Sequence, residues 1–118
     1  MSWKNILKNT SDDIDWKKIT GETREYWKDW MRTEFEAWMR DIKSSIDYAG
    51  NYFRIELRTQ MGELIKKAHE HKSKNEIFEF AVIIRFIGKE IEPLLEEAIF
   101  EKKRDERREN RRRRRRRR

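Results

Sequence analysis

Apolar side chains recur every three or four residues between positions 21 and 49, which is the period of an amphipathic helix. Thr20 is the expected N-cap, and Gly50 with Asn51 is a natural stop. The pattern predicts one helix of about eight turns over residues 21–49. Its apolar positions are Trp27, Met31, Phe35, Trp38, Ile42, Ile46 and Ala49, and Trp30 widens the stripe.

The segment that follows fits two different structures. Phe53, Ile55 and Leu57 alternate with charged residues, which is typical of a strand. A helical spacing sustained across the whole segment accounts for more of its residues, so we predict a helix over residues 52–72. An α+β fold, with strands near 52–58 and 77–87, is the alternative. The helical face would comprise Phe53, Leu57, Met61, Leu64, Ile65 and Ala68.

Two further helices complete the predicted fold. A nearly continuous apolar run predicts a helix over residues 76–87, closed by Gly88. Pro93 is tolerated at a helix start, so a fourth helix is expected over residues 92–109. The chain is therefore expected to be all-α, a small helical bundle of three to four helices. The apolar positions expected around the fourth helix are Ile91, Leu94, Leu95, Ala98 and Phe100.

The residues before this bundle are expected to form a loose lead-in over 1–20. Ser2 is a candidate N-cap for a first short helix, and residues 11–13 offer a second N-cap for a turn that carries Ile14 and Ile19. The predicted organisation is thus a lead-in over 1–20, a helical domain over 21–109 and a tail over 110–118.

Charge is distributed very unevenly along the chain. The 118 residues carry 30 basic and 23 acidic side chains, a net charge of +7. The last eight residues are all arginine, and removing them leaves 22 basic and 23 acidic side chains, a net charge of −1. Eight like charges with no apolar neighbour repel one another, so the sequence predicts a disordered Arg-rich tail.

The arginine tail is the strongest functional signal in the sequence. The guanidinium group is planar, always charged and able to bind phosphate oxygens with two parallel hydrogen bonds. If all eight arginines engaged duplex DNA, log K against log salt would have a slope of roughly −7, and about −5 to −6 on a single strand. The candidate nucleic-acid-binding residues are Arg107, Arg108, Arg111, Arg112, Arg113, Arg114, Arg115, Arg116, Arg117 and Arg118.

The arginine tail also fits origins and roles that do not involve nucleic acid. An artificial tag, or a low-complexity run without a specific role, would give the same eight arginines. An anionic membrane would attract them as well, at roughly 1 kcal/mol for each arginine near the surface.

Five tryptophans lie in the first third of the chain, interleaved with lysine and arginine. Single-strand binders combine aromatic and basic side chains in this way. However, Trp27 and Trp38 share the helical phase of Met31 and Ile42, so we interpret them as core residues. If two of Trp3, Trp16 and Trp30 were exposed together, they would form a protein-contact patch rather than a platform for bases.

Catalysis, metals and cofactors are not expected. The chain has no cysteine, and residues two apart on a helix point about 200° away from each other, so His69 and His71 would not share a metal. Glu56 near Arg58 and Asp41 near Lys43 faintly match the acid-x-base element of metal-dependent nucleases, but such pairs arise by chance in so charged a chain. No glycine-rich phosphate loop is present.

Self-association is expected from the run at residues 77–87. A helix that is apolar on all sides needs cover on all sides, which three other small helices would barely supply. A homo-oligomer formed through this run and the fourth helix would present its cationic tails as one multivalent ligand.

The most economical hypothesis is a non-enzymatic, sequence-nonspecific nucleic-acid-binding accessory or packaging protein, with DNA or RNA phosphates as its partner. No apolar run reaches the ~18–20 residues of a transmembrane helix, and no signal peptide is recognisable, so a cytoplasmic or nucleic-acid-associated location is expected. The alternative is an interaction adaptor whose tail docks on an acidic protein or an anionic membrane.

Overall fold

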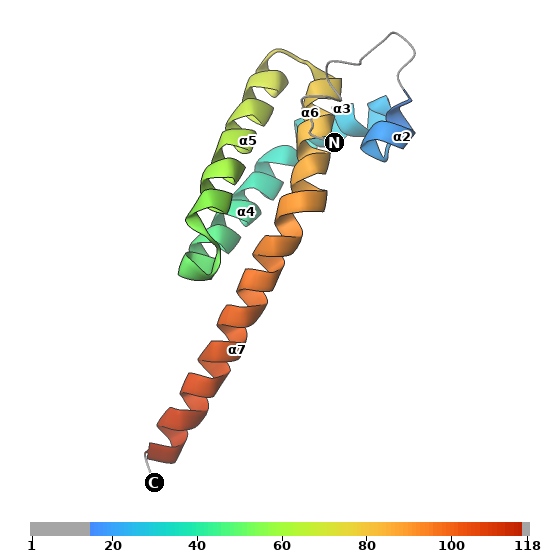
Figure 1. Cartoon of the computed structure of the whole chain (residues 1–118). Coiled ribbons are helices and arrows are strands. Elements are labelled where there is room, and N and C mark those ends of the chain that lie inside the picture. The colour runs from blue at the N-terminus through green and yellow to red at the C-terminus, as the bar shows by residue number, and fades with distance from the viewer. Residues whose placement is uncertain (1–14, 117–118) are drawn as a thin grey trace.

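The computed structural model describes residues 15–116, and their side chains up to residue 113. Nearly all of this part of the chain is helical and none of it is strand, so the all-α prediction is confirmed, but the described residues form more helices than the three to four expected (Figure 1). The strands offered as an alternative near 52–58 and 77–87 are wrong, because both segments are helical. The expected helix at the extreme N-terminus, with Ser2 and Trp3, lies outside the described residues. Within the described residues no helix is both long and apolar enough to cross a membrane.

Helix α2 (Trp16–Thr20) is the short second element of the lead-in. Its N-cap is Asp15, whose carboxylate accepts a hydrogen bond from the Lys18 amide at 3.2 Å, so the cap falls later than the predicted residues 11–13. The helix ends at Gly21, which has a φ of +84°. This backbone conformation favours glycine, and a Cβ at Gly21 would displace the guanidinium group of Arg85, whose Nη1 would lie 1.9 Å away.

The predicted single helix over 21–49 is in fact two helices, α3 (Arg24–Thr33) and α4 (Phe35–Ala49), which meet at Glu34. The N-cap of α3 is Thr23 rather than Thr20. The Thr33 hydroxyl donates to the Asp29 carbonyl oxygen at 2.9 Å, and such bonding to the preceding turn tends to bend helices. The division lets α3 pack on α6 while α4 runs beside α7.

A short 3₁₀ turn, η1 (Gly50–Tyr52), leads into α5 (Ile55–Ser73). The predicted helix over 52–72 is therefore correct in kind but begins three residues later. The Arg58 side chain donates to the carbonyl oxygens of Gly50 and Phe53, which holds the turn against the first turn of α5. Ile55 is 71% exposed while Phe53 is buried, so the strand-like alternation here has no structural counterpart.

Helix α6 (Ile77–Phe86) continues through a π turn, η2 (Ile87–Ile91), into α7 (Glu92–Arg116). Figure 1 shows the three as one unbroken rod. The predicted stop at Gly88 is wrong. Pro93 has no N–H to donate and its ring would crowd the carbonyl of Lys89 in a regular helix. In the π turn the amide of Glu92 instead donates to the oxygen of Ile87, five residues back, and the chain stays helical.

The C-terminal segment departs from prediction as well. Helix α7 runs through Asn110 to Arg116, so the expected helix end at 109 is wrong, and residues 111–116 are helical where the sequence predicts a disordered tail. Arginine is a strong helix former, and adding a residue to an existing helix is far easier than starting one. Cations are also favoured at a helix C-terminus by the helix dipole.

The apolar run in α6 is covered within one chain. Seven of its ten residues are buried, and α2, α3 and α5 all contact it. The reason for expecting a dimer through this run, that one chain could barely cover it, therefore does not hold for the described residues.

The centre of the fold is an aromatic cluster that joins four helices. Phe35 of α4 and Phe80 of α6 are both fully buried, with ring centroids 4.9 Å apart. Trp30 of α3 lies 5.9 Å from Phe80, and Trp38 lies 6.0 Å from Phe35. Trp38 Nε1–H donates to Glu92 Oε1 at 2.9 Å, which ties α4 to the first residue of α7.

Candidate nucleic-acid interface

Helix α7 is fastened to the body by contacts at the C-terminal end of α4. The Tyr48 hydroxyl donates to Glu106 Oε2 at 2.9 Å. Lys102 Nζ donates to the Tyr48 carbonyl and lies 4.3 Å from the centroid of the Tyr48 ring, a cation–π arrangement. Just after α4, the Tyr52 hydroxyl donates to Asp105 Oδ2 at 2.7 Å. These contacts hold α7 to the body as far as Glu106.

The helix sorts the mixed charges of residues 101–111 onto two faces. Glu101, Asp105 and Glu109 recur every four residues and share the side that holds the tyrosine contacts. Away from that side the exposed charged residues are basic, namely Lys103, Arg104, Arg107 and Arg111, and Arg104 Nε also lies 3.9 Å from Asp105 Oδ1. A segment whose charges alternate in sequence therefore presents a cationic face to solvent.

Figure 1 shows the C-terminal end of α7 projecting past the ends of α4 and α5. Of the predicted binding residues, Arg107, Arg108, Arg111, Arg112 and Arg113 are all exposed on this projecting end. Among the side chains described there, the only ion pair is Arg113 Nε with Glu109 Oε1 at 4.0 Å. Exposed pairs of this length contribute little, so these guanidinium groups are free to take phosphate oxygens.

The structure describes the remaining predicted binding residues only in part. Arg114, Arg115 and Arg116 belong to α7 by their backbone, but their side chains are outside the described part. Arg117 and Arg118 lie outside it altogether.

The four tryptophans in the described part of the chain all lie in the core or pack against it. Trp27 is buried, as predicted, and Trp38 is half-buried in the aromatic cluster. Trp30 packs in the same cluster, and Trp16 makes an edge contact with Phe78 at 5.2 Å. Trp3 lies outside the described residues. The interpretation of Trp27 and Trp38 as core residues is confirmed.

The two histidines have separate surroundings. His69 Nε2 lies 2.9 Å from Met39 Sδ, whereas His71 Nδ1 pairs with Glu76 Oε1 at 3.2 Å. Within the described residues no group of three or more histidine, aspartate or glutamate side chains is placed to hold a metal ion. Of the acid-x-base pairs, Arg58 is engaged with backbone carbonyls, and Asp41 and Glu56 are exposed.

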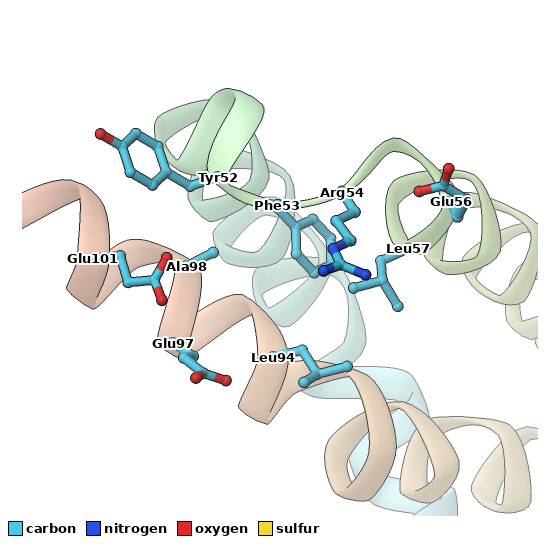
Figure 2. A pocket seen from close by; sticks show the side chains of 9 residues that line it. All are labelled: Tyr52, Phe53, Arg54, Glu56, Leu57, Leu94, Glu97, Ala98 and Glu101. Carbon is cyan, nitrogen blue, oxygen red and sulfur yellow. The ribbon is translucent and has the colours of Figure 1, made fainter.

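The surface carries two grooves that the sequence did not indicate. The larger, of about 580 Å³, lies between the start of α5 and the middle of α7 (Figure 2). Leu57 and Leu94 form part of its apolar lining, while Glu97 and Glu101 make its α7 side acidic. With three glutamates and one arginine, Arg54, in its lining, this groove suits an apolar or basic protein segment better than phosphate.

The smaller groove, of about 350 Å³, lies between α4 and α5 and has the opposite character. Its lining contains four residues that carry or can carry positive charge, Lys43, Arg58, Lys66 and His69, and no acidic residue. The body has a net charge close to zero, but this groove gives it one local cationic surface. A charge sum along the sequence could not show it, because the lysines come from two helices.

The two tyrosines that fasten α7 have altered acidity. The hydrogen bond to Glu106 raises the pKa of Tyr48 above its ordinary value, and the bond to Asp105 does the same for the pKa of Tyr52. A raised folded-state pKa means that these contacts stabilise the fold fully below the ordinary tyrosine pKa. The contribution is lost as the pH rises through the raised pKa values.

We therefore expect both tyrosines to ionise above pH ~10 in a spectrophotometric titration of the folded protein. Glu106→Gln should lower the midpoint of Tyr48, and Asp105→Asn that of Tyr52, because each removes a negative charge that disfavours tyrosinate. Tyr48→Phe and Tyr52→Phe assign the two signals. Tyrosine titration midpoints that do not change in the two carboxylate variants would contradict the contacts of Tyr48 with Glu106 and of Tyr52 with Asp105.

Comparison of the chain with protein-family models, with curated proteins and with solved structures gives no match in any of the three.

Proposed function

We propose that this protein binds nucleic acid through the phosphate backbone, without sequence specificity and without catalysis, using the projecting end of α7. The observation that carries the proposal is that Arg107, Arg108 and Arg111 to Arg113 are exposed beyond the last contacts between α7 and the body. Guanidinium groups held there are accessible from most directions and match phosphate oxygens in geometry and charge. Backbone contacts carry no direct sequence information, so DNA and RNA are both expected ligands.

The body would then act in an accessory or packaging role, as the part that contacts partners. The acidic, partly apolar groove between α5 and α7 supports a protein contact at the base of the arginine arm. Self-association remains part of the proposal, although the covered α6 removes the reason for placing its interface there. The α7 residues that line the groove end at Glu101, almost two helical turns before Arg107, the first arginine of the projecting end, so the two contacts need not compete.

The alternative is an adaptor whose arginine end docks on an acidic protein or an anionic membrane. Both functions would use the same residues, so they differ only in the anion preferred. The guanidinium fork matches phosphate and carboxylate oxygens alike, so a competition between these anions is needed to separate the two functions.

The competing functions can be separated by a direct competition. The full chain is bound to a fluorescent oligonucleotide and titrated, at matched salt, with inorganic polyphosphate or with phosphatidylserine vesicles of equal total charge. We expect polyphosphate to displace the oligonucleotide at much lower charge concentration than vesicles do. Displacement by vesicles at the lower concentration would favour the membrane adaptor instead.

A further inference from the structure

Phe100 is the most exposed aromatic side chain among the described residues. Its side chain is 66% exposed. By contrast, Ala98, two residues earlier, is buried, and Lys102, two residues later, donates to the Tyr48 carbonyl. On a helix with 3.6 residues per turn, Phe100 points about 140° away from Leu95, which is 3% exposed and faces the core. None of the ring contacts within the described residues involves Phe100. A large apolar ring is therefore presented to solvent on the outer side of α7.

The residues that follow Phe100 on this outer side are basic. Lys103 and Arg104 come three and four residues later, and Arg107 and Arg111 continue the same face. All four are exposed. Arg104 Nε lies 3.9 Å from Asp105 Oδ1, an exposed pair that contributes little and leaves the guanidinium group accessible to phosphate. Phe100 thus stands at the near end of a cationic row that extends about 16 Å to Arg111.

The residues that precede Phe100 have the opposite charge. Glu96 and Glu97 lie one turn back toward the body and are exposed. Phosphates following the basic row from Arg111 would meet repulsion as soon as they passed Phe100. The ring therefore marks the boundary between a surface that attracts a nucleic-acid strand and one that repels it.

We propose that Phe100 stacks on an unpaired base while Arg104, Arg107 and Arg111 hold the phosphates of the same strand, so that this end of α7 prefers single-stranded nucleic acid to duplex. An aromatic ring beside a row of cations is the arrangement by which single strands are bound without sequence preference. In a duplex the bases are already stacked on one another, and the ring gains no contact. The inference rests on the proposed function and specifies its ligand.

The test compares three ligands of equal length: a single-stranded oligonucleotide, the same strand with abasic sites in place of bases, and a duplex. Phe100→Ala is expected to weaken binding of the single strand by roughly 5- to 150-fold, the range measured for loss of one stacked base. Binding of the abasic strand and of the duplex should not change, because the phosphate contacts remain. Phe100→Trp should retain the preference for the single strand.

Ile55→Ala is the matched control, because Ile55 is also an exposed apolar residue, at 71%, but belongs to α5 and lines neither groove. It should leave all three affinities unchanged. If Phe100→Ala binds the single strand as tightly as the unmodified chain, or loses affinity equally for all three ligands, the stacking role is wrong while nucleic-acid binding itself stands. If the unmodified chain binds none of the three, both the stacking role and the proposed function fail.

Discussion

Deletion of residues 111–118 is expected to abolish salt-sensitive binding of DNA and RNA while leaving the body folded. The deleted residues lie beyond the contacts of Tyr48 and Tyr52 with α7, so no described packing is removed. What remains has a net charge of −1 and retains Arg107 and Arg108 as its outermost cations. Each phosphate contact adds to the affinity and to its salt dependence. Removing eight cations should therefore remove most of the affinity for nucleic acid.

The salt dependence of the full chain also reports the shape of the bound tail. Eight arginines that all reached duplex phosphates would give a slope of roughly −7 in log K against log salt. Successive residues of a helix turn by about 100°, so Arg111, Arg112 and Arg113 project in three different directions. A tail that stays helical cannot lay all its arginines on one strand, and we expect a slope shallower than roughly −7.

Mobility shifts of the full and truncated chains across a salt series measure both effects. Replacing the eight arginines by glutamine keeps the length and removes the charge, and it should reproduce the deletion. Replacing them by lysine keeps the charge, and it should retain the slope with some loss of affinity because the bidentate contact is gone. Equal binding by the truncated chain would refute the arm as the site and point to the cationic groove of Lys43 and Lys66.

The Phe35→Ala substitution is expected to lower the free energy of unfolding by about 3–5 kcal/mol, the range found for Phe→Ala in well-packed cores. Phe35 is fully buried and its ring contacts Phe80, Trp38 and His69. It is also the first residue of α4, immediately after the break at Glu34. Loss of the ring would therefore leave a cavity at the point where α3, α4 and α6 meet.

Because small domains have only about 5–15 kcal/mol of total stability, this single change should leave the protein close to unfolding. Urea denaturation followed by tryptophan fluorescence gives the midpoint and the slope. Tyr26→Ala, at a ring that is 45% exposed on α3, is the matched control and should cost far less. A loss below ~1 kcal/mol for Phe35→Ala would show that the aromatic cluster does not form the centre of the core.

Periodicity is sufficient to predict the elements that bury one long stripe. The helix around Met61, Leu64 and Ala68 follows from spacing alone, and all three residues are buried. The break at Glu34 does not follow, because the apolar spacing runs through it without interruption. It depends on which partner each half packs against, which is long-range information.

The junction between α6 and α7 escapes prediction for a different reason. Gly88 and Pro93 are ordinary signals of a helix end and a helix start when each is interpreted locally. A π turn that adds one residue to the hydrogen-bonded ring satisfies Pro93 without ending the helix. Local rules do not distinguish these outcomes, since only the burial of Ile87 and Ile91 favours continuing the rod.

The candidate site is predictable in its charge and not in its shape. The run of arginines locates Arg107, Arg108 and Arg111 directly. The sequence places Phe100 among the apolar positions of the last helix together with Leu95 and Ala98, yet in the structure it lies on the outer side. The spacing in the sequence gives the angle between Phe100 and Leu95 on the helix. Because several apolar residues surround Phe100, the sequence does not show that Phe100 lies outside the core.

Because the helix is unbroken from Ile77 to Arg116, the arginine end is a rigid extension of the body and not a flexible tail. A flexible tail would allow the body to take many positions around the polyanion that the arginines bind. The ten helical residues beyond Glu106 instead hold the end of α7 about 15 Å from the last contact with the body and in a fixed direction relative to it. Copies arrayed along a polyanion would accordingly share one spacing from it, and a body bearing a protein-binding groove would present that groove at a constant height above the strand.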